Sequence, residues 1–251
     1  MPFSIRDNQQ GYSLVEVIIV VLILGIIAGI AVRSLSSSSD VSRTRETVAE
    51  LDRIAHAIAG DPDRLSGGVR VDYGYVGDVG SLPGSLDALV SNPGGLGTWS
   101  GPYLQDELTA GAADYTFKRD AWGQVYTYTG GNTIASSGGG SPITRQIARS
   151  VDDLLYNRVS LAVTDIDNVP PGPTYADSLA VVLVYPDGSG AYATRSRSPD
   201  PNGLVEFDSI PIGLHRLQVV YIPEADTLIR RVPVDPGRGY YAEIHLNREL
   251  W

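Results

Sequence analysis

An almost unbroken apolar run at residues 14–32 constrains this chain more than any other feature of its sequence. As a helix the run would rise about 28 Å, close to the roughly 30 Å of hydrocarbon in a bilayer. One carboxylate, Glu16, lies inside its entrance. An ionisable residue in a membrane costs on the order of 3 kcal/mol at the helix centre and usually marks a function. The run therefore predicts a membrane helix whose single charge needs an explanation.

Two ordinary membrane signals explain this segment less well. A plain signal anchor would be equally apolar, but nothing in it calls for Glu16. A cleaved secretory peptide needs a basic start, a shorter apolar core and a small-residue cut site. Residues 29–31, Gly-Ile-Ala, could form such a site. However, the run is too long, and the leader before it carries only Arg6 and the terminal amine against Asp7.

Residues 11–16, Gly-Tyr-Ser-Leu-Val-Glu, together with the run that follows, resemble the cleavage and methylation motif of type IV pilins and type II secretion pseudopilins. The resemblance implies a leader at residues 1–11, removed by a prepilin peptidase that cuts after Gly11. The same enzyme would methylate the new amine of Tyr12, where most relatives carry phenylalanine. Residues 12–33 would then form a transmembrane helix that becomes the filament core.

The proposed cut supplies a partner for the buried carboxylate. It would leave an ammonium on Tyr12, about 6 Å along the helix axis from Glu16. An uncompensated carboxylate in lipid favours an arrangement that pairs it, and the pair could close within one chain or between staggered neighbours. Gly25 and Gly29 would let helix backbones approach closely in lipid, although glycine is also common in membrane helices generally.

The helix is expected to continue beyond the membrane. Arg33 stands where many relatives carry a helix-weakening proline, so a local melt of the core helix is less expected. Residues 41–59 read as helix, which can run on from the membrane part, and Gly-Asp-Pro at residues 60–62 ends it. Four apolar side chains at helical spacing predict a stripe facing a core: Val48, Leu51, Ala55 and Ile58.

Two later motifs narrow the resemblance to the major pseudopilin class. Residues 99–104 (Trp-Ser-Gly-Pro-Tyr-Leu) and 120–126 (Asp-Ala-Trp-Gly-Gln-Val-Tyr) are similar to a Gly-Pro-Tyr turn and an Asp-Pro-Trp-Gly-x-Pro-Tyr hairpin of that class. Ala121 and Val125 replace the two prolines. Aromatic and β-branched residues on both sides of the turn predict two strands. The resemblance implies a globular domain at residues 34–155, in which a long helix packs on a small antiparallel sheet.

Calcium is the one cofactor that the resemblance suggests, because major pseudopilins often bind it in the loop after this hairpin. The carboxylates offered in that region are Asp152 and Asp153, with Ser137 as a further oxygen ligand. Calcium takes six to eight oxygens, typically with several carboxylates. The alternative is an aspartate pair that faces water at the edge of a helix or turn.

The last third of the chain predicts a separate all-β domain at residues 156–251. About seven short apolar runs from residue 158 are split by Pro, Asp and Gly turns, which is typical of a β-sandwich. Residues 203–207 and 210–215 resemble the strand, Ile-Pro-x-Gly turn and next strand of transthyretin-like, carboxypeptidase-regulatory sandwiches, which are usually structural or adhesive. The expected fold class is therefore α+β, a long helix on a small sheet followed by an all-β sandwich.

Composition and motifs argue against several functions. The chain has no cysteine and a formal net charge of −10 without a basic stripe, which argues against disulfides and nucleic-acid binding. Its three histidines form no His-Glu-x-x-His motif, and no nucleophile elbow or phosphate loop is present, so no enzyme is predicted.

The predicted function is a structural subunit of a type II secretion pseudopilus, anchored once in the inner membrane with its soluble part in the periplasm or on an extracytoplasmic filament. Its expected partners are further copies, other pseudopilins, the prepilin peptidase, the inner-membrane assembly platform and lipid. The alternative is a minor type IV pilin whose sandwich at residues 156–251 is an adhesin or ligand-binding head.

Overall fold

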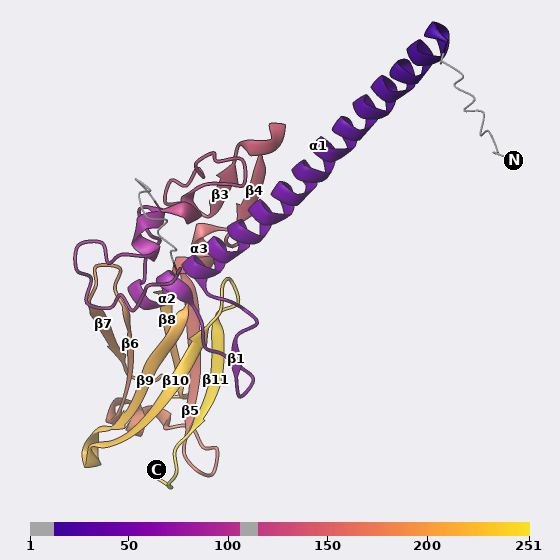
Figure 1. Cartoon of the computed structure of the whole chain (residues 1–251). Coiled ribbons are helices and arrows are strands. Elements are labelled where there is room, and N and C mark those ends of the chain that lie inside the picture. The colour runs from indigo at the N-terminus through magenta and orange to yellow at the C-terminus, as the bar shows by residue number, and fades with distance from the viewer. Residues whose placement is uncertain (1–12, 106–114) are drawn as a thin grey trace, which may run out of the picture. The chain divides into compact units, whose positions relative to one another are not determined.

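The computed structural model describes residues 13–105 and 115–251, and for residues 32–37 it describes the backbone alone. The chain forms two compact units, Met1–Arg45 and Glu46–Trp251. The first contains most of one long helix. The second contains the end of that helix, a small mixed body and a β-sandwich (Figure 1).

One helix, α1 (Leu14–Ala59), runs for 46 residues. It passes Arg33 without a break, so the expectation of a continuous helix is confirmed. The stretch Leu14–Ala31 has a mean hydropathy of 3.0 and, among the described residues, is the one helix long and apolar enough to cross a membrane. The helix ends at Gly60, whose φ of +81° suits glycine and whose missing side chain leaves room for the Asp72 carbonyl.

The buried face of the soluble half of α1 differs from the predicted stripe at one position. Leu51, Ala55 and Ile58 are buried as expected, but Val48 is 42% exposed, so that part of the prediction is wrong. Thr47 and Ile54 are fully buried instead. The face is centred between Thr47 and Leu51, which leaves Val48 at its edge. The polar Thr47 is tolerated because its hydroxyl accepts a hydrogen bond from the Ala121 backbone at 3.2 Å.

Short elements follow this end of α1, and several of them share one apolar core with it. A two-stranded antiparallel sheet joins β3 (Thr133–Ser136) to β4 (Ile143–Gln146), with Ile134 opposite Arg145 and fully buried. The other elements are β1 (Leu65–Ser66), β2 (Val69–Arg70), α2 (Gly74–Val79), η1 (Leu86–Leu89), η2 (Thr116–Lys118), η3 (Gly138–Gly140) and α3 (Val151–Leu155).

The predicted hairpin at residues 115–128 is present as a chain reversal but without its two strands. The segment before the turn is the 3-10 helix η2, and the pairing that remains is the isolated bridge between Arg119 and Val125. The reason lies in the aromatic side chains on the two sides of the turn. Phe117 and Tyr126 are buried against the core, and the Tyr126 hydroxyl donates to Glu50 of α1 at 2.9 Å.

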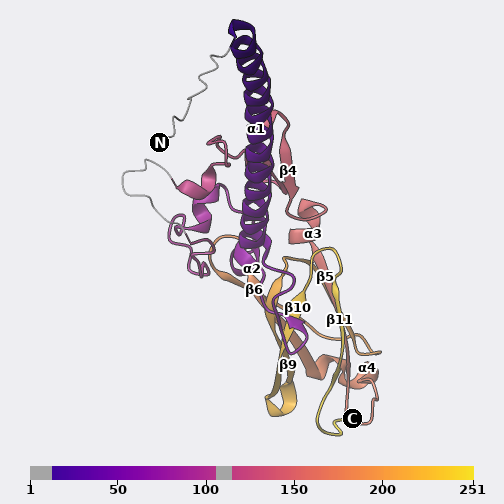
Figure 2. The same ribbon diagram turned by 45° about the vertical axis from the view of Figure 1, so that its right-hand side comes forward.

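The seven strands expected after residue 156 are all present and form two sheets (Figures 1 and 2). One sheet has the order β10–β9–β6–β7 and the other β11–β5–β8, with β11 parallel to β5. Side chains from both sheets enclose one apolar core that includes Leu161, Leu183 and Phe207. The α+β fold class is thereby confirmed. The strands are β5 (Asn157–Thr164), β6 (Leu179–Pro186), β7 (Tyr192–Arg197), β8 (Leu204–Ile210), β9 (Gly213–Tyr221), β10 (Asp226–Val234) and β11 (Tyr240–His245).

Candidate functional site

The first turn of α1 holds the glutamate expected to serve in assembly. The Ser13 hydroxyl accepts a hydrogen bond from the Glu16 backbone N–H at 3.3 Å, so Ser13 caps the helix. Ser-x-x-Glu at residues 13–16 is the capping-box pattern, a signal that the sequence prediction missed. Gly11 and Tyr12 lie outside the described residues. The cleavage site and the Tyr12–Glu16 charge pair therefore stay predictions.

The apolar half of α1 has no partner within the described chain. Its large side chains from Leu14 to Ile30 are about half exposed or more. Gly25 and Gly29 have no other atom within 4 Å of where a Cβ would stand. Glycine in a helix is about 1 kcal/mol less favourable than alanine, and nothing in the described fold requires it there. These features suit a helix that is covered from outside, by lipid or by other helices.

The turn of the second motif is organised by one buried carboxylate, Asp120. Its Oδ1 accepts from the backbone N–H groups of Trp122 (2.9 Å) and Gln124 (2.8 Å). Its Oδ2 accepts from the Ser136 hydroxyl (2.6 Å) and from the Gly138 N–H (3.1 Å). Burial would raise the pKa of Asp120, but these hydrogen bonds hold it below its ordinary value. The motif aspartate thus fastens the turn to the end of β3.

The first motif packs around a second aspartate, Asp78 of α2. The Tyr103 hydroxyl donates to Asp78 at 2.9 Å and accepts from the Ser100 N–H at 3.1 Å. The Tyr103 ring meets those of Tyr75 and Trp99 edge-on, with centroids 5.7 Å apart in each pair. Both motifs therefore stabilise the body around α1, and neither presents a catalytic arrangement.

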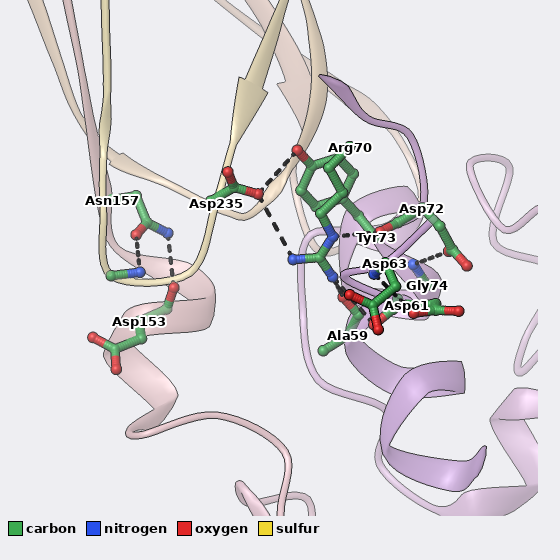
Figure 3. A network of polar contacts seen from close by, with 12 residues as sticks. Ala59, Asp61, Asp63, Arg70, Asp72, Tyr73, Gly74, Asp153, Asn157 and Asp235 are labelled. Atoms are coloured by element: carbon green, nitrogen blue, oxygen red, sulfur yellow. Dashed lines mark hydrogen bonds and ion pairs between the residues drawn. The ribbon is translucent and has the colours of Figure 1, made fainter. Parts of the chain in front are cut away.

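A polar network joins the end of α1 to the sandwich (Figure 3). Arg70, whose side chain is 9% exposed, donates to the carbonyls of Ala59 (2.6 Å) and Gly60 (3.1 Å). The same guanidinium lies 3.7 Å from a carboxylate oxygen of Asp235, which follows β10. The Tyr73 hydroxyl donates to that carboxylate at 3.3 Å. Burial and the charge of Asp235 raise the pKa of Tyr73, so it stays a neutral donor.

The turn between β8 and β9 adds an apolar contact to this junction. Ile212 belongs to the sandwich in sequence, yet it is fully buried in the core around α1. Its backbone N–H donates to the Leu154 carbonyl of α3 at 2.9 Å. Asn157 connects α3 to the turn between β10 and β11, since it accepts from the Gly237 N–H (2.9 Å) and donates to the Asp153 carbonyl (3.0 Å). The sandwich is therefore docked on the body through a shared core rather than tethered by a free linker.

The three calcium candidates belong to two different elements. Asp152 and Asp153 lie in the first turn of α3, and Ser150 caps that helix. Negative charges at a helix N-terminus stabilise the helix through its dipole. Ser137 precedes η3. In the described parts of the chain, no three His, Cys, Asp or Glu side chains gather as a metal ion would require. The calcium site stays a prediction.

Comparison with known proteins agrees with the N-terminal features. Residues 6–32 match the model of the prokaryotic N-terminal methylation motif. The chain carries a type IV pilin-like methylation motif. It is also 27% identical to type II secretion system core protein G of Xanthomonas campestris pv. campestris over 124 residues, which are 49% of this chain and 70% of that protein. The resemblance to pilins and pseudopilins is thereby confirmed, and it supports a pilin-like role.

Among solved structures, the chain is similar to a variant of the major pilin subunit of Bacillus cereus. The two are 13% identical, with a TM-score of 0.23, over 47% of this chain and 37% of that one. The chain thus spans little more than a third of that pilin, and a likeness this weak carries no argument. The matched motif and the apolar helix that it includes fit a single membrane anchor.

Proposed function

We propose that this chain is a structural, non-catalytic subunit of a type II secretion pseudopilus. A prepilin peptidase cuts after Gly11 and methylates Tyr12, and the processed chain assembles through α1 to support protein secretion. One observation carries the proposal: the methylation motif at residues 6–32 includes the apolar part of α1, whose large side chains are exposed in the isolated chain. The similarity to core protein G supports the choice of machine.

The physical sequence of events follows from that helix. Before assembly, lipid of the inner membrane covers residues 14–31, and the soluble part lies in the periplasm. During assembly, the platform in the inner membrane brings processed copies together, and neighbouring helices replace the lipid. The ammonium of Tyr12 then neutralises Glu16, because a lone carboxylate among packed apolar helices is strongly disfavoured.

The N-terminus of the membrane form tests the processing step. Intact mass and N-terminal sequencing of the protein, extracted from its native membrane, should find methylated Tyr12 as the first residue. The same protein from cells without the peptidase should begin at Met1. An uncut chain in wild-type cells would overturn the proposal.

Two variants separate the charge of Glu16 from its place in the helix cap. Glu16→Gln removes the charge but keeps a side chain that can serve a capping box, so we expect insertion and cleavage without filament assembly. Ser13→Ala removes the cap acceptor and should cost the helix about 1 kcal/mol while assembly continues. Glu46→Gln, an exposed position on the same helix, is the matched control. Normal filaments from Glu16→Gln would refute the charge-pair argument.

The docked sandwich keeps a second function in view, that of a minor type IV pilin with a binding head. Because the sandwich shares a core with the body around α1, every copy in a filament must accommodate its bulk. A subunit present in few copies does so more easily than a major one. The ratio of this chain to other pilin-like subunits in purified filaments distinguishes the two: a large excess supports a major subunit, and a few copies per filament support a minor one.

A further inference from the structure

The sandwich presents an outer sheet face that is unusually apolar for a surface. Strand β6 reads as a continuous apolar run, Leu-Ala-Val-Val-Leu-Val-Tyr-Pro, a pattern typical of strands covered on both sides. Its inward side chains Leu179, Val181 and Leu183 are fully buried. Its outward residues Val182 and Val184 are only partly buried. Within the described chain, α2 contacts β6 and β9, yet Val182 and Val184 keep part of their surface open to solvent.

A groove of about 540 Å³ lies on this outer face, which we call the basic face. It is lined in part by Val184, Tyr192 and Ile229, of which Tyr192 is 66% and Ile229 50% exposed. Arg216 of β9 and Arg231 of β10 line it too. Its lining includes no acidic side chain. The surface thus combines apolar contact area with two positive charges, in a chain whose net charge is −10.

The two arginines stand directly opposite each other in the sheet. Arg231 is the register partner of Arg216, and like charges in that relation are destabilising. In the described residues neither guanidinium forms an ion pair. Arg216 donates to the Gln218 amide oxygen, at 2.7 and 3.2 Å, when that amide is turned to face it. A cross-strand pair of this kind is relieved by carboxylates from outside, which arginine binds bidentately.

The opposite outer face of the same sandwich carries carboxylates in excess. On the sheet β11–β5–β8, the exposed side chains of Glu206, Asp208 and Glu243 lie on the side turned away from the core. Arg158 lies 3.0 Å from Asp208 and 3.9 Å from Glu206, and Arg195 of β7 donates to the Asp208 backbone carbonyl at 2.6 Å. Tyr241, 61% exposed, supplies apolar surface beside Glu243. We call this side the acidic face.

We propose that the basic face of one copy docks on the acidic face of a second copy of this chain. The two faces have opposite charge and each offers an exposed tyrosine, so a second copy provides the chemistry that the basic face lacks. The contact is heterologous, because it joins different surfaces of identical subunits. Such contacts form open helical arrays when the rotation between copies does not close a ring.

This contact deepens the proposed function, since it adds a link between the sandwiches of subunits that α1 assembles. Exposed ion pairs alone contribute little, about 0–1 kcal/mol each. The apolar centre around Val184, Tyr192 and Ile229 must therefore supply much of the affinity, while the charges set the register and the choice of partner. Association of the sandwiches should weaken as salt rises, unlike the packing of α1 within lipid.

Crosslinking provides a direct test, because the chain has no native cysteine. Full-length Ile229→Cys and Tyr241→Cys proteins are solubilised in detergent, mixed, and treated with a short bismaleimide. The mixture should give at least fivefold more crosslinked dimer than either protein alone, because only the mixed pair joins the two faces. Predominant Ile229→Cys homodimers would show a symmetric contact instead. Absence of any enriched dimer, or capture of a different acidic protein by the basic face, would also overturn the proposal.

Charge reversal with compensation gives the second arm of the test. Two double variants reverse the charges of one face each: Arg216→Glu with Arg231→Glu for the basic face, and Glu206→Arg with Glu243→Arg for the acidic face. Each double variant should reduce the mixed crosslink at least fivefold. All four changes together should restore it. The matched control is Arg149→Glu with Arg238→Glu, two exposed arginines outside both faces. No rescue in the fourfold variant would refute the pairing. Since the detergent-solubilised chain is studied apart from filaments, this result is independent of whether Tyr12 is processed or Glu16 is required.

Discussion

Replacing Asp120 with asparagine isolates the hydrogen bonds that hold the turn of the second motif. The substitution keeps the shape and the Oδ1 acceptor that serves the N–H groups of Trp122 and Gln124. It replaces Oδ2 with an amide that faces two donors, the Ser136 hydroxyl and the Gly138 N–H. The hydroxyl can rotate and accept, but the Gly138 N–H cannot, so a buried donor loses its carboxylate.

The expected loss of stability follows from these contacts. A buried donor left without its acceptor costs about 1–3 kcal/mol, and each remaining bond loses roughly 1 kcal/mol when its acceptor is no longer charged. Part of the first cost is recovered, because the Gly138 N–H also lies 3.2 Å from the Ser136 oxygen. Asp120→Asn should therefore destabilise the protein by about 3 kcal/mol, without creating a cavity.

Urea unfolding of the full chain in detergent, followed by tryptophan fluorescence, measures this loss. With a slope of about 1–3 kcal/mol/M, the midpoint should fall by about 1–3 M. Asp177→Asn removes the same charge at an exposed position and should change stability by less than about 0.5 kcal/mol.

Acid supplies an internal check on the same reasoning. The pKa of Asp120 is depressed in the folded protein from its ordinary 3.8, so its stabilisation is complete above that value and is lost as pH falls through the folded pKa. The difference between wild type and Asp120→Asn should shrink below about pH 4. A loss equal to that of Asp177→Asn, or a difference unchanged in acid, would refute the assignment.

Three further predictions concern other contacts of the fold. Lowering pH from 7.5 to 5.5 should destabilise wild type more than His215→Gln. Burial depresses the pKa of His215 in the folded protein, so the unfolded chain binds a proton that the folded chain does not. Parallel profiles of unfolding free energy against pH for the two proteins would contradict this. Ile212→Ala should lower the free energy of unfolding in urea by about 2–5 kcal/mol, because Ile212 is fully buried in the core around α1. A loss well below that range would show that the sandwich is not docked there. Gly25→Leu should reduce the yield of filaments in a pelleting assay without changing the fold of the chain, because open space surrounds that glycine. Ala31→Leu, on another side of the helix, should leave the yield unchanged. Equal filament yields from the two variants would exclude a contact through Gly25.

The regular elements could be predicted because their signals are local. Strand positions followed from apolar runs bounded by turn residues, and the end of α1 followed from Gly60 and the proline after it. Both signals depend on neighbours within a few residues. The stripe on α1 was misplaced at Val48 because its exact centre depends on Thr47, whose burial is set by a hydrogen bond from Ala121, 74 positions away.

One local signal occurs at four sites among the described residues and was not used in the sequence prediction. At each site an aspartate Oδ1 accepts from the backbone N–H groups two and four residues later, and the residue three positions later has a positive φ. This is a three-residue loop closed by a residue in the left-handed region, and its sequence signature here is Asp-x-x-Gly or Asp-x-x-Asn. The four aspartates are Asp120, Asp165, Asp187 and Asp200.

The junction between body and sandwich could not be predicted from the sequence. Arg70 and Asp235 are far apart in the chain, and neither belongs to a motif. Ile212 lies in an Ile-Pro-x-Gly turn that predicts a strand connection and says nothing of what the turn packs against. Its burial in the core around α1 depends on the tertiary arrangement of α3 and β9, which propensity and periodicity do not encode.

This junction has a consequence for assembly. Arg70 binds the last carbonyls of α1 and approaches Asp235, while Ile212 fills the core beneath the same helix end. The sandwich therefore keeps a fixed relation to residues 46–59 of α1. If copies are arranged with helical symmetry through α1, the basic and acidic faces of neighbouring sandwiches must meet in the same way at every step or at none. The free energy of one sandwich contact would then be repeated at every subunit along the filament, so this contact helps decide whether copies of this chain extend a filament or stop it.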